Sequence, residues 1–156
     1  MHRSRLDSEL QRLFLTRRTA ALATLDDELI PHVSLVPYAV DPGCARLVIL
    51  VSGLAAHTIH MQRRADVSVL LSEGEAVGEP VHALSRLTLH AQAEEDASRQ
   101  AAAVYLARFP EAEEIAQLPD FRYFLLKVRS ARQVAGFGAA RDLSAEAVER
   151  LVRTLG

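Results

Sequence analysis

Alternating hydrophobic and polar residues predict that the chain folds mainly into short β-strands. The clearest case is the segment 84–93, where every second residue is apolar. One face carries Leu87, Leu89, Ala91 and Ala93, and the other carries Arg86, Thr88, His90 and Gln92. This period of two is typical of a strand with one buried face. Similar patterns predict strands at 19–25, 29–40, 46–51, 67–71 and 121–134, of which 46–51 is apolar enough to be buried on both faces.

Helical spacing of apolar residues predicts helices around and between these strands. Ser4 and Asp7 have the spacing of a capping box at the start of a helix that reaches Phe14. A second helix is expected after Gly53, running to about Arg64. Three further helical segments are predicted at 96–108, 111–117 and from 144 onward, the first and last capped by Asp96 and Ser144.

Turn residues between neighbouring strands indicate an antiparallel arrangement. The segments 26–28 and 41–43 are typical turns, and six short strands at hairpin spacing favour a closed barrel with flanking helices over a parallel sheet. Pro31 and Pro37 interrupt the second strand, so we expect an edge, a bulge or a break there. A barrel of six strands is narrow, so side chains and not a ligand fill its interior. We therefore expect one mainly β domain of the α+β class over residues 1–156, with its ligand in an external groove that a second subunit completes.

Composition and charge exclude several functions. A net charge of −2 argues against non-specific binding of nucleic acid. No apolar run approaches the roughly 20 residues that a membrane span needs, and the N-terminus has no apolar signal region. Cys44 is the only cysteine, which excludes an internal disulfide and fits a reducing cytoplasm. Lys127 is the only lysine, so we expect an anion to be bound by arginine, histidine, hydroxyls or backbone.

The strongest candidate site is the junction within residues 47–61, where a buried strand leads through Ser52 and Gly53 into a helix with His57 and Thr58 in its first turns. The junction combines a hydroxyl, an imidazole and free backbone N–H groups, which together suit a phosphate. Ser52 is alternatively a simple N-cap, and His57 a surface histidine. His57 and His60 lie three residues apart on the helix, but without a third ligand they predict no metal site.

The polar face of the segment 84–93 carries a weaker signal. Arg86 lies beside Thr88, and its guanidinium is either solvated or aimed at a carbonyl or phosphate. Gly136-Phe137-Gly138 begins like a dinucleotide fingerprint, but Arg141 stands at the third glycine position. The sequence also has no P-loop lysine motif, nucleophile elbow or paired cysteines.

Six short motifs occur in an order that resembles a known family. They are 20–25 AALATL, Pro31 with 34–39 SLVPYA, 52–58 SGLAAHT, 86–89 RLTL, 105–110 YLARFP and 135–138 AGFG. Together they are similar to the pyridoxamine 5′-phosphate oxidase-related FMN-binding split-barrel superfamily, and most of all to its haem-utilisation branch. The similarity covers roughly residues 12–141.

The resemblance implies a six-stranded split barrel and a homodimer with two FMN sites at its interface. In such a protein the strand of Ser34 and Val36 lies along the isoalloxazine ring, and Ser52, His57 and Thr58 match the positions that hold the phosphate. Arg86 and Thr88 match the strand that reaches the partner's flavin. The segment that binds substrate in true pyridoxamine phosphate oxidases is missing, and no histidine follows His90.

These implications support three hypotheses. The first is a cytoplasmic, FMN-dependent oxidoreductase with a small-molecule substrate or electron donor, in which the protein positions the cofactor. The second is a flavin or haem carrier without turnover, because no side chain stands out as a general acid or base. The third is a barrel retained only for dimerisation. Haem degradation is a weaker alternative to these.

Overall fold

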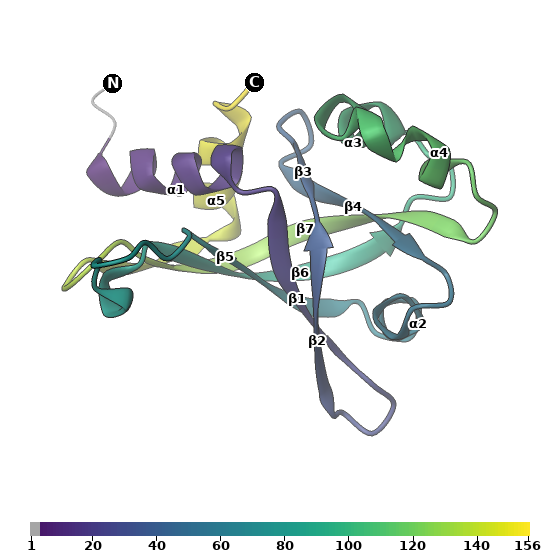
Figure 1. Ribbon diagram of the computed structural model, residues 1–156, viewed down its shortest axis with the longest axis horizontal. Helices are drawn as coiled ribbons and strands as arrows, with labels where there is room; N and C mark the ends of the chain where they lie inside the picture. The colour runs from purple at the N-terminus through teal and green to yellow at the C-terminus, as the bar shows by residue number, and fades with distance from the viewer. Residues whose placement is uncertain (1–3) are drawn as a thin grey trace.

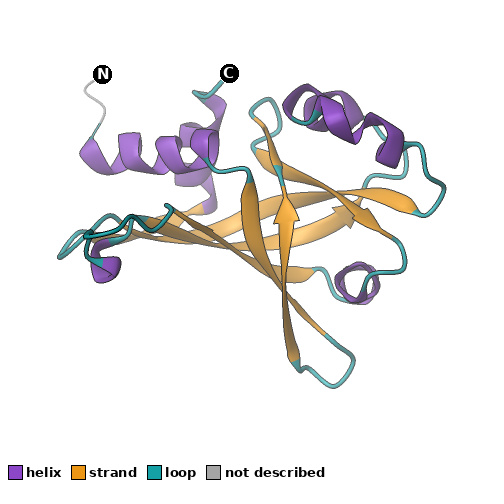
Figure 2. Ribbon diagram, viewed as in Figure 1, coloured by secondary structure: helices purple, strands orange, loops and turns teal. Residues whose placement is uncertain are grey.

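The computed structural model describes residues 4–156 and shows an antiparallel sheet with helices at its ends and on one face (Figure 1; Figure 2). The strands are β1 Thr19–Leu25, β2 Pro31–Pro37, β3 Ala39–Asp41, β4 Arg46–Ser52, β5 Asp66–Ser72, β6 Arg86–Glu95, β7 Phe121–Val134 and β8 Ala140–Ser144. The α-helices are α1 Arg5–Thr16, α2 Ala56–Arg63, α3 Ala102–Arg108, α4 Glu113–Ala116 and α5 Ala145–Arg153, with short 3₁₀ turns η1 at Val81–Ala83 and η2 at Pro110–Ala112.

The strands form one sheet in the order β2-β1-β5-β6-β7-β4-β3, with β8 added to β7. Every pairing is antiparallel, and β2 also contacts β4 across the open side of the curled sheet. The hairpin of β1 and β2 projects away from the helices α1 and α5 (Figure 1). The predicted class, a mainly antiparallel split barrel with flanking helices, is therefore confirmed, although the described residues contain eight strands and six were expected.

The core lies on the concave face of the sheet, as the alternation in 84–93 predicts. Leu87, Leu89 and Ala91 of β6 are fully buried there together with residues of α1. A second cluster covers the other face of β4 and β7, where Tyr105 and Phe109 pack on Val48 and its neighbours. Because hydrophobic groups cover both of its faces, β4 is buried throughout its middle, which confirms the interpretation of 46–51.

The capping residues predicted for the first and last helices are confirmed. Ser4 Oγ accepts from the Asp7 backbone N–H at 3.1 Å, and the Asp7 carboxylate accepts from the Ser4 N–H, which completes a capping box. Ser144 caps α5 by accepting from the Ala147 N–H. Among the described residues, no helix is long and apolar enough to cross a membrane.

Other element boundaries refine or differ from the sequence prediction. The break expected at the prolines of the second strand falls at Tyr38, directly after Pro37, and β2 is an edge strand. The buried Tyr38 hydroxyl donates to the carbonyls of Leu13 and Phe14 and so ties the break to α1. The third helix begins at Ala102 because the Asp96 carboxylate accepts from the Ala101 N–H and holds the preceding residues in a turn. Strand β8 was not predicted, since its five residues form a strand only by pairing with β7.

Candidate functional site

The strand-to-helix junction is built around Gly53, which follows β4 directly. A Cβ atom at this position would lie 2.9 Å from the Asp120 carbonyl oxygen and 3.0 Å from Arg122 Nε. Real Cβ atoms essentially never approach a backbone oxygen so closely, so only glycine lets the two segments meet. The turn then runs through Leu54 to Ala55, and α2 begins at Ala56. The helix therefore starts two residues later than Leu54, the first position after Gly53.

Ser52 ends β4, and its hydroxyl is fully engaged within the chain. Ser52 Oγ donates to Asp120 Oδ2 at 3.0 Å and accepts from the Leu54 N–H at 3.2 Å. Ser52 is not an N-cap, because Ala55 occupies the cap position of α2 without a side-chain bond. The partner Asp120 lies 68 residues away in sequence, and no local pattern could have identified it.

Thr58 is fully buried beneath the junction. Its Oγ1 donates to the Ser52 carbonyl oxygen at 2.6 Å. This bond links the first turn of α2 to the end of β4. The Thr58 hydroxyl is therefore a structural tie in the isolated chain and does not face an external groove.

His57 joins α2 to the hairpin. Its Nδ1 lies 3.0 Å from Ser34 Oγ on β2, and its Nε2 is buried without a hydrogen-bond partner among the described residues. Burial lowers the pKa of His57 below its ordinary value, and the nearby imidazoles of His32 and His60 lower it further. Burial therefore favours the neutral ring, which is a weaker electrostatic partner for a phosphate than an imidazolium.

Two further histidines, His32 and His60, lie near His57, and the sequence alone assigned neither of them a role. His60 Nδ1 lies 2.8 Å from Thr24 Oγ1 on β1. The rings of His32 and His60 meet edge to face, with their centroids 5.5 Å apart. His32 is exposed on β2, and the hairpin register places it opposite Thr24. The structure thus gathers three imidazoles between α2 and the hairpin.

The remaining predicted residues lie elsewhere. Val36 is buried in the core, so only its backbone is available at the edge strand β2. Arg86 is half-buried, and its Nη1 donates to the Leu84 carbonyl oxygen at 3.0 Å. Thr88 is exposed two residues further along β6.

Arg86 and Ser52 cannot meet within one chain. Ser52 pairs with Phe121 at one end of β7, and Arg86 pairs with Val134 at the other end. At about 3.3 Å per residue, these ends are roughly 40 Å apart. A single ligand contacted by both residues would therefore need Arg86 from a second copy.

The junction matches a phosphate poorly as it stands. The side-chain donors of Ser52 and Thr58 are already used within the chain, and the Asp120 carboxylate lies against Ser52. The nearby guanidinium of Arg122 is paired with Glu95 at 3.1 Å. A phosphate would compete with Asp120 for the Ser52 proton, and the first backbone N–H groups of α2 would be its remaining donors. The assignment of Ser52, His57 and Thr58 to a phosphate stays a prediction.

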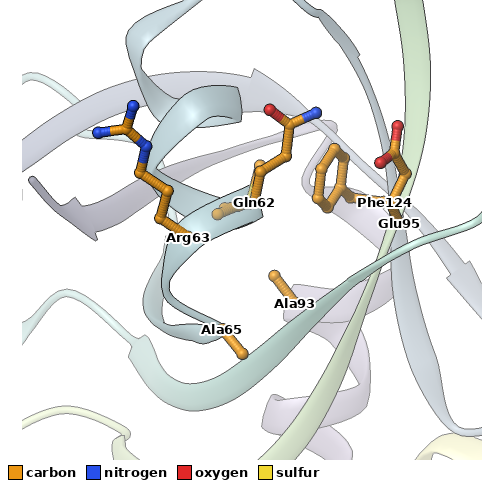
Figure 3. A pocket seen from close by; sticks show the side chains of 7 residues that line it. Gln62, Arg63, Ala65, Ala93, Glu95 and Phe124 are labelled. Carbon is orange, nitrogen blue, oxygen red and sulfur yellow. The ribbon is translucent and has the colours of Figure 1, made fainter.

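An open cleft lies at the other end of α2, where sequence analysis assigned no function (Figure 3). Its volume is about 550 Å³, and its lining residues are Met61, Gln62, Arg63, Ala65, Ala93, Glu95 and Phe124. The Phe124 ring lies between the side chains of Gln62 and Glu95 in Figure 3. Arg63 and Glu95 both form ion pairs, with Asp27 and Arg122 respectively, so the cleft presents no unpaired charge.

Comparison with known protein families matches most of this sequence to one family. The family model for pyridoxamine 5′-phosphate oxidase matches residues 6–135. The chain is also 31% identical to "Heme oxygenase HutZ" of Vibrio cholerae serotype O1 over 148 residues, which cover 91% of this chain and 83% of the relative.

Two solved structures extend the comparison. The "heme binding protein from Mycobacterium smegmatis" has a TM-score of 0.84 at 27% identity, covering 96% of this chain. This chain spans only 62% of that protein's length. The crystal structure of HutZ, "the heme storage protein from Vibrio cholerae", has a TM-score of 0.71 at 26% identity and covers 90% of this chain and 96% of its own. The order of the strands and the family match agree: the chain belongs to the pyridoxamine 5′-phosphate oxidase family.

Proposed function

We propose that this protein binds haem and serves in haem utilisation. The observation that carries the proposal is the state of the predicted phosphate site, where hydroxyl protons are already donated within the chain and a carboxylate lies beside Ser52. Support comes also from two relatives: HutZ of Vibrio cholerae, which is described both as a heme oxygenase and as a heme storage protein, and the heme binding protein of Mycobacterium smegmatis. This function was an alternative in the sequence analysis, where FMN was favoured.

The surface of the chain suits a large apolar ligand. On the convex face of the sheet, Val33 is 64% exposed and Leu35 71% exposed, and Leu70 of β5 lies in the same row as Leu35. Exposed apolar residues gathered on one face mark an interaction site. Bound haem would supply an iron centre for storage or redox chemistry. The chain's own residues would bind the apolar macrocycle, hold the iron and exclude water.

A homodimer is part of this proposal. Strand β2 is an edge strand of the described sheet and exposes Val33 and Leu35 on one face. Such an edge invites pairing with a second chain unless it is covered. A second copy would cover it and would bring its own Arg86 toward the ligand groove of the first. Replacing Leu35 with Ser should shift a dimer toward monomer in sedimentation velocity, whereas the exposed Val77→Ser in the 72–80 loop should not.

Titration of the purified full chain with haemin tests the function directly. We expect saturable one-to-one binding with a shifted Soret band, and a rise in thermal stability that grows with ligand concentration. Serum albumin and an unrelated β-protein serve as references for non-specific adsorption. Binding that does not saturate, or no thermal shift at saturating haemin, would reject haem as the ligand.

A second candidate is an FMN-dependent oxidoreductase. It is favoured by the family match and by the meeting of Ser34, Ser52, His57 and Thr58 around one junction. In this case the flavin would carry the electrons, and the chain would position the ring and the phosphate. Arg86 from the partner would have to leave the Leu84 carbonyl to reach the flavin.

FMN titration separates the two candidates. If Arg86 donates a charge-assisted bond to flavin, Arg86→Ala should weaken FMN binding by about 1.5–3 kcal/mol. Oxidation of a nicotinamide nucleotide by the FMN-loaded protein would support turnover. A protein that remains colourless and takes up no added FMN excludes this candidate and leaves haem binding untouched.

A further inference from the structure

The convex face of the sheet contains a platform that the sequence did not reveal. Strand registers place Val33, Ala23, Ser68, His90 and Ser130 in one row across β2, β1, β5, β6 and β7. The neighbouring row contains Leu35, Ala21, Leu70, Thr88 and Arg132. Small side chains, Ala23 and Ser68, fill the middle of the first row, so a flat ligand can approach the sheet closely there, beside the apolar Leu70 of the second row.

His90 stands on this platform with a carboxylate beside it. Its Nε2 lies 3.5 Å from Asp66 Oδ1, and both side chains are at least half exposed. A carboxylate near one imidazole nitrogen favours the proton on that nitrogen, which leaves the other nitrogen with a free lone pair. Among the described residues, no other hydrogen bond or ion pair engages His90. The pair therefore places an imidazole with a neighbouring carboxylate on the solvent-facing side of the sheet, as in many metal ligands.

Two clefts meet at His90, and their linings differ in charge. The first, of about 250 Å³, includes Ala23, Leu25 and Pro31 as its apolar wall. The second, of about 270 Å³, combines apolar surface of Ala131 and Leu143 with the polar side chains of Thr88, Ser130 and Arg132. Both clefts are also lined by Ser68 and His90, so they form one groove with the imidazole at its centre. Arg132 forms an exposed ion pair with Asp142. Such surface pairs contribute little free energy, so Arg132 can exchange Asp142 for another anion.

We propose that His90 is the axial ligand of the haem iron, with Asp66 as its positioning residue. This inference rests on the proposed haem binding and names the atoms that would hold the ligand. A porphyrin is flat, apolar on one side and anionic at its propionate edge, which matches a groove that is apolar on one side of His90 and carries Arg132 on the other.

Other potential iron ligands are less suitable. All three tyrosines and Met61 are buried in the core. Nδ1 of His57 and of His60 is engaged by a hydroxyl, and His57 Nε2 is buried. Cys44 is exposed but lies in the turn before β4, away from this groove. His90 combines exposure, an orienting carboxylate and a groove, which none of these residues does.

Haemin titration of the full chain and of two variants tests the inference. His90→Ala should weaken haemin binding at least tenfold and replace the histidine-ligated Soret and electron paramagnetic resonance spectra with those of another species. Added imidazole should restore the spectrum of the original protein. The matched control is His82→Ala, an exposed histidine on η1 outside the groove, which should leave both affinity and spectra unchanged. Asp66→Asn should retain haemin but raise the iron's midpoint potential, since the imidazole becomes a weaker donor.

The outcomes distinguish this inference from the proposed function. If the original chain binds no haemin, haem binding itself fails. If it binds haemin and His90→Ala keeps the same affinity and spectrum, haem binding stands and the ligand assignment is wrong. Equal losses in His90→Ala and His82→Ala also overturn the assignment, because they indicate adsorption on surface histidines. Circular dichroism and sedimentation of each variant report its folding, and His90→Gln replaces the alanine variant if that variant unfolds.

Discussion

The strand-to-helix junction and the convex face of the sheet both carry hydroxyl groups and histidines, yet they use them differently. At the junction, Ser52 and Thr58 bond to groups of their own chain. On the convex face, Thr88 and His90 are exposed, and the only charged partner of His90 is the exposed carboxylate of Asp66. Buried polar groups must be paired to offset their desolvation, whereas exposed groups remain available for a ligand. Residue type alone therefore does not separate structural from ligand-binding positions.

The largest expected effect at the junction comes from Gly53→Ala. The new methyl group would lie 2.9 Å from the Asp120 backbone oxygen, so the backbone must shift. We expect a loss of about 1–3 kcal/mol in the free energy of unfolding, measured by urea denaturation. Gly74→Ala is the control, since its Cβ would lie 3.7 Å from the nearest atom, in a flexible arginine side chain. Equal effects of the two substitutions would show that Gly53 does not anchor the junction.

A matched pair of threonine substitutions compares the two regions directly. Thr58→Val keeps the shape of the buried side chain but removes its bond to the Ser52 carbonyl, which retains the Ala55 N–H as a donor. We expect a loss of about 1 kcal/mol in the free energy of unfolding. Thr88→Val, on the exposed face, should stay within about 0.5 kcal/mol of the original protein. A larger loss in the free energy of unfolding for Thr88→Val than for Thr58→Val would contradict the distinction between the two regions.

The histidines at the junction predict a dependence of stability on pH. The pKa of His57 is lowered in the folded state, so the unfolded chain binds a proton more readily. Stability should therefore be complete above the unfolded pKa of about 6.5 and should fall as the pH drops below it. His57→Gln, which can keep a bond to Ser34, should show a shallower fall in urea midpoints measured from pH 7.5 to 5. Parallel curves for the two proteins would contradict the prediction.

The smallest effect is expected on the convex face. Arg132 and Asp142 form an exposed ion pair at 3.1 Å. Arg132→Ala should change the free energy of unfolding by no more than roughly 0.5 kcal/mol, because solvent screens such pairs. Thermal melts in low and high salt measure this difference. A loss comparable to that of Gly53→Ala would mean that the pair is structural and unsuited to exchange with a ligand.

Much of the fold could be predicted because local patterns determine it. The alternation in 84–93 identifies the buried face of β6, and Ser4 and Asp7 identify the start of α1. The junction could also be located, since a buried strand followed by glycine and helix-forming residues is a local signal. The chemistry of the junction could not be predicted, because Asp120 reaches Ser52 from a distant part of the chain.

The positions of most strands, the alternation of buried and exposed residues and the family resemblance follow from the amino-acid sequence, because each depends on neighbouring residues. Which polar groups are free depends on the assembled fold. Strand register brings Ser68 beside His90, and the fold joins Ser52 to Asp120 and His57 to Ser34. Register and packing depend on contacts between residues that are far apart in sequence, so they appear only when the sheet is assembled.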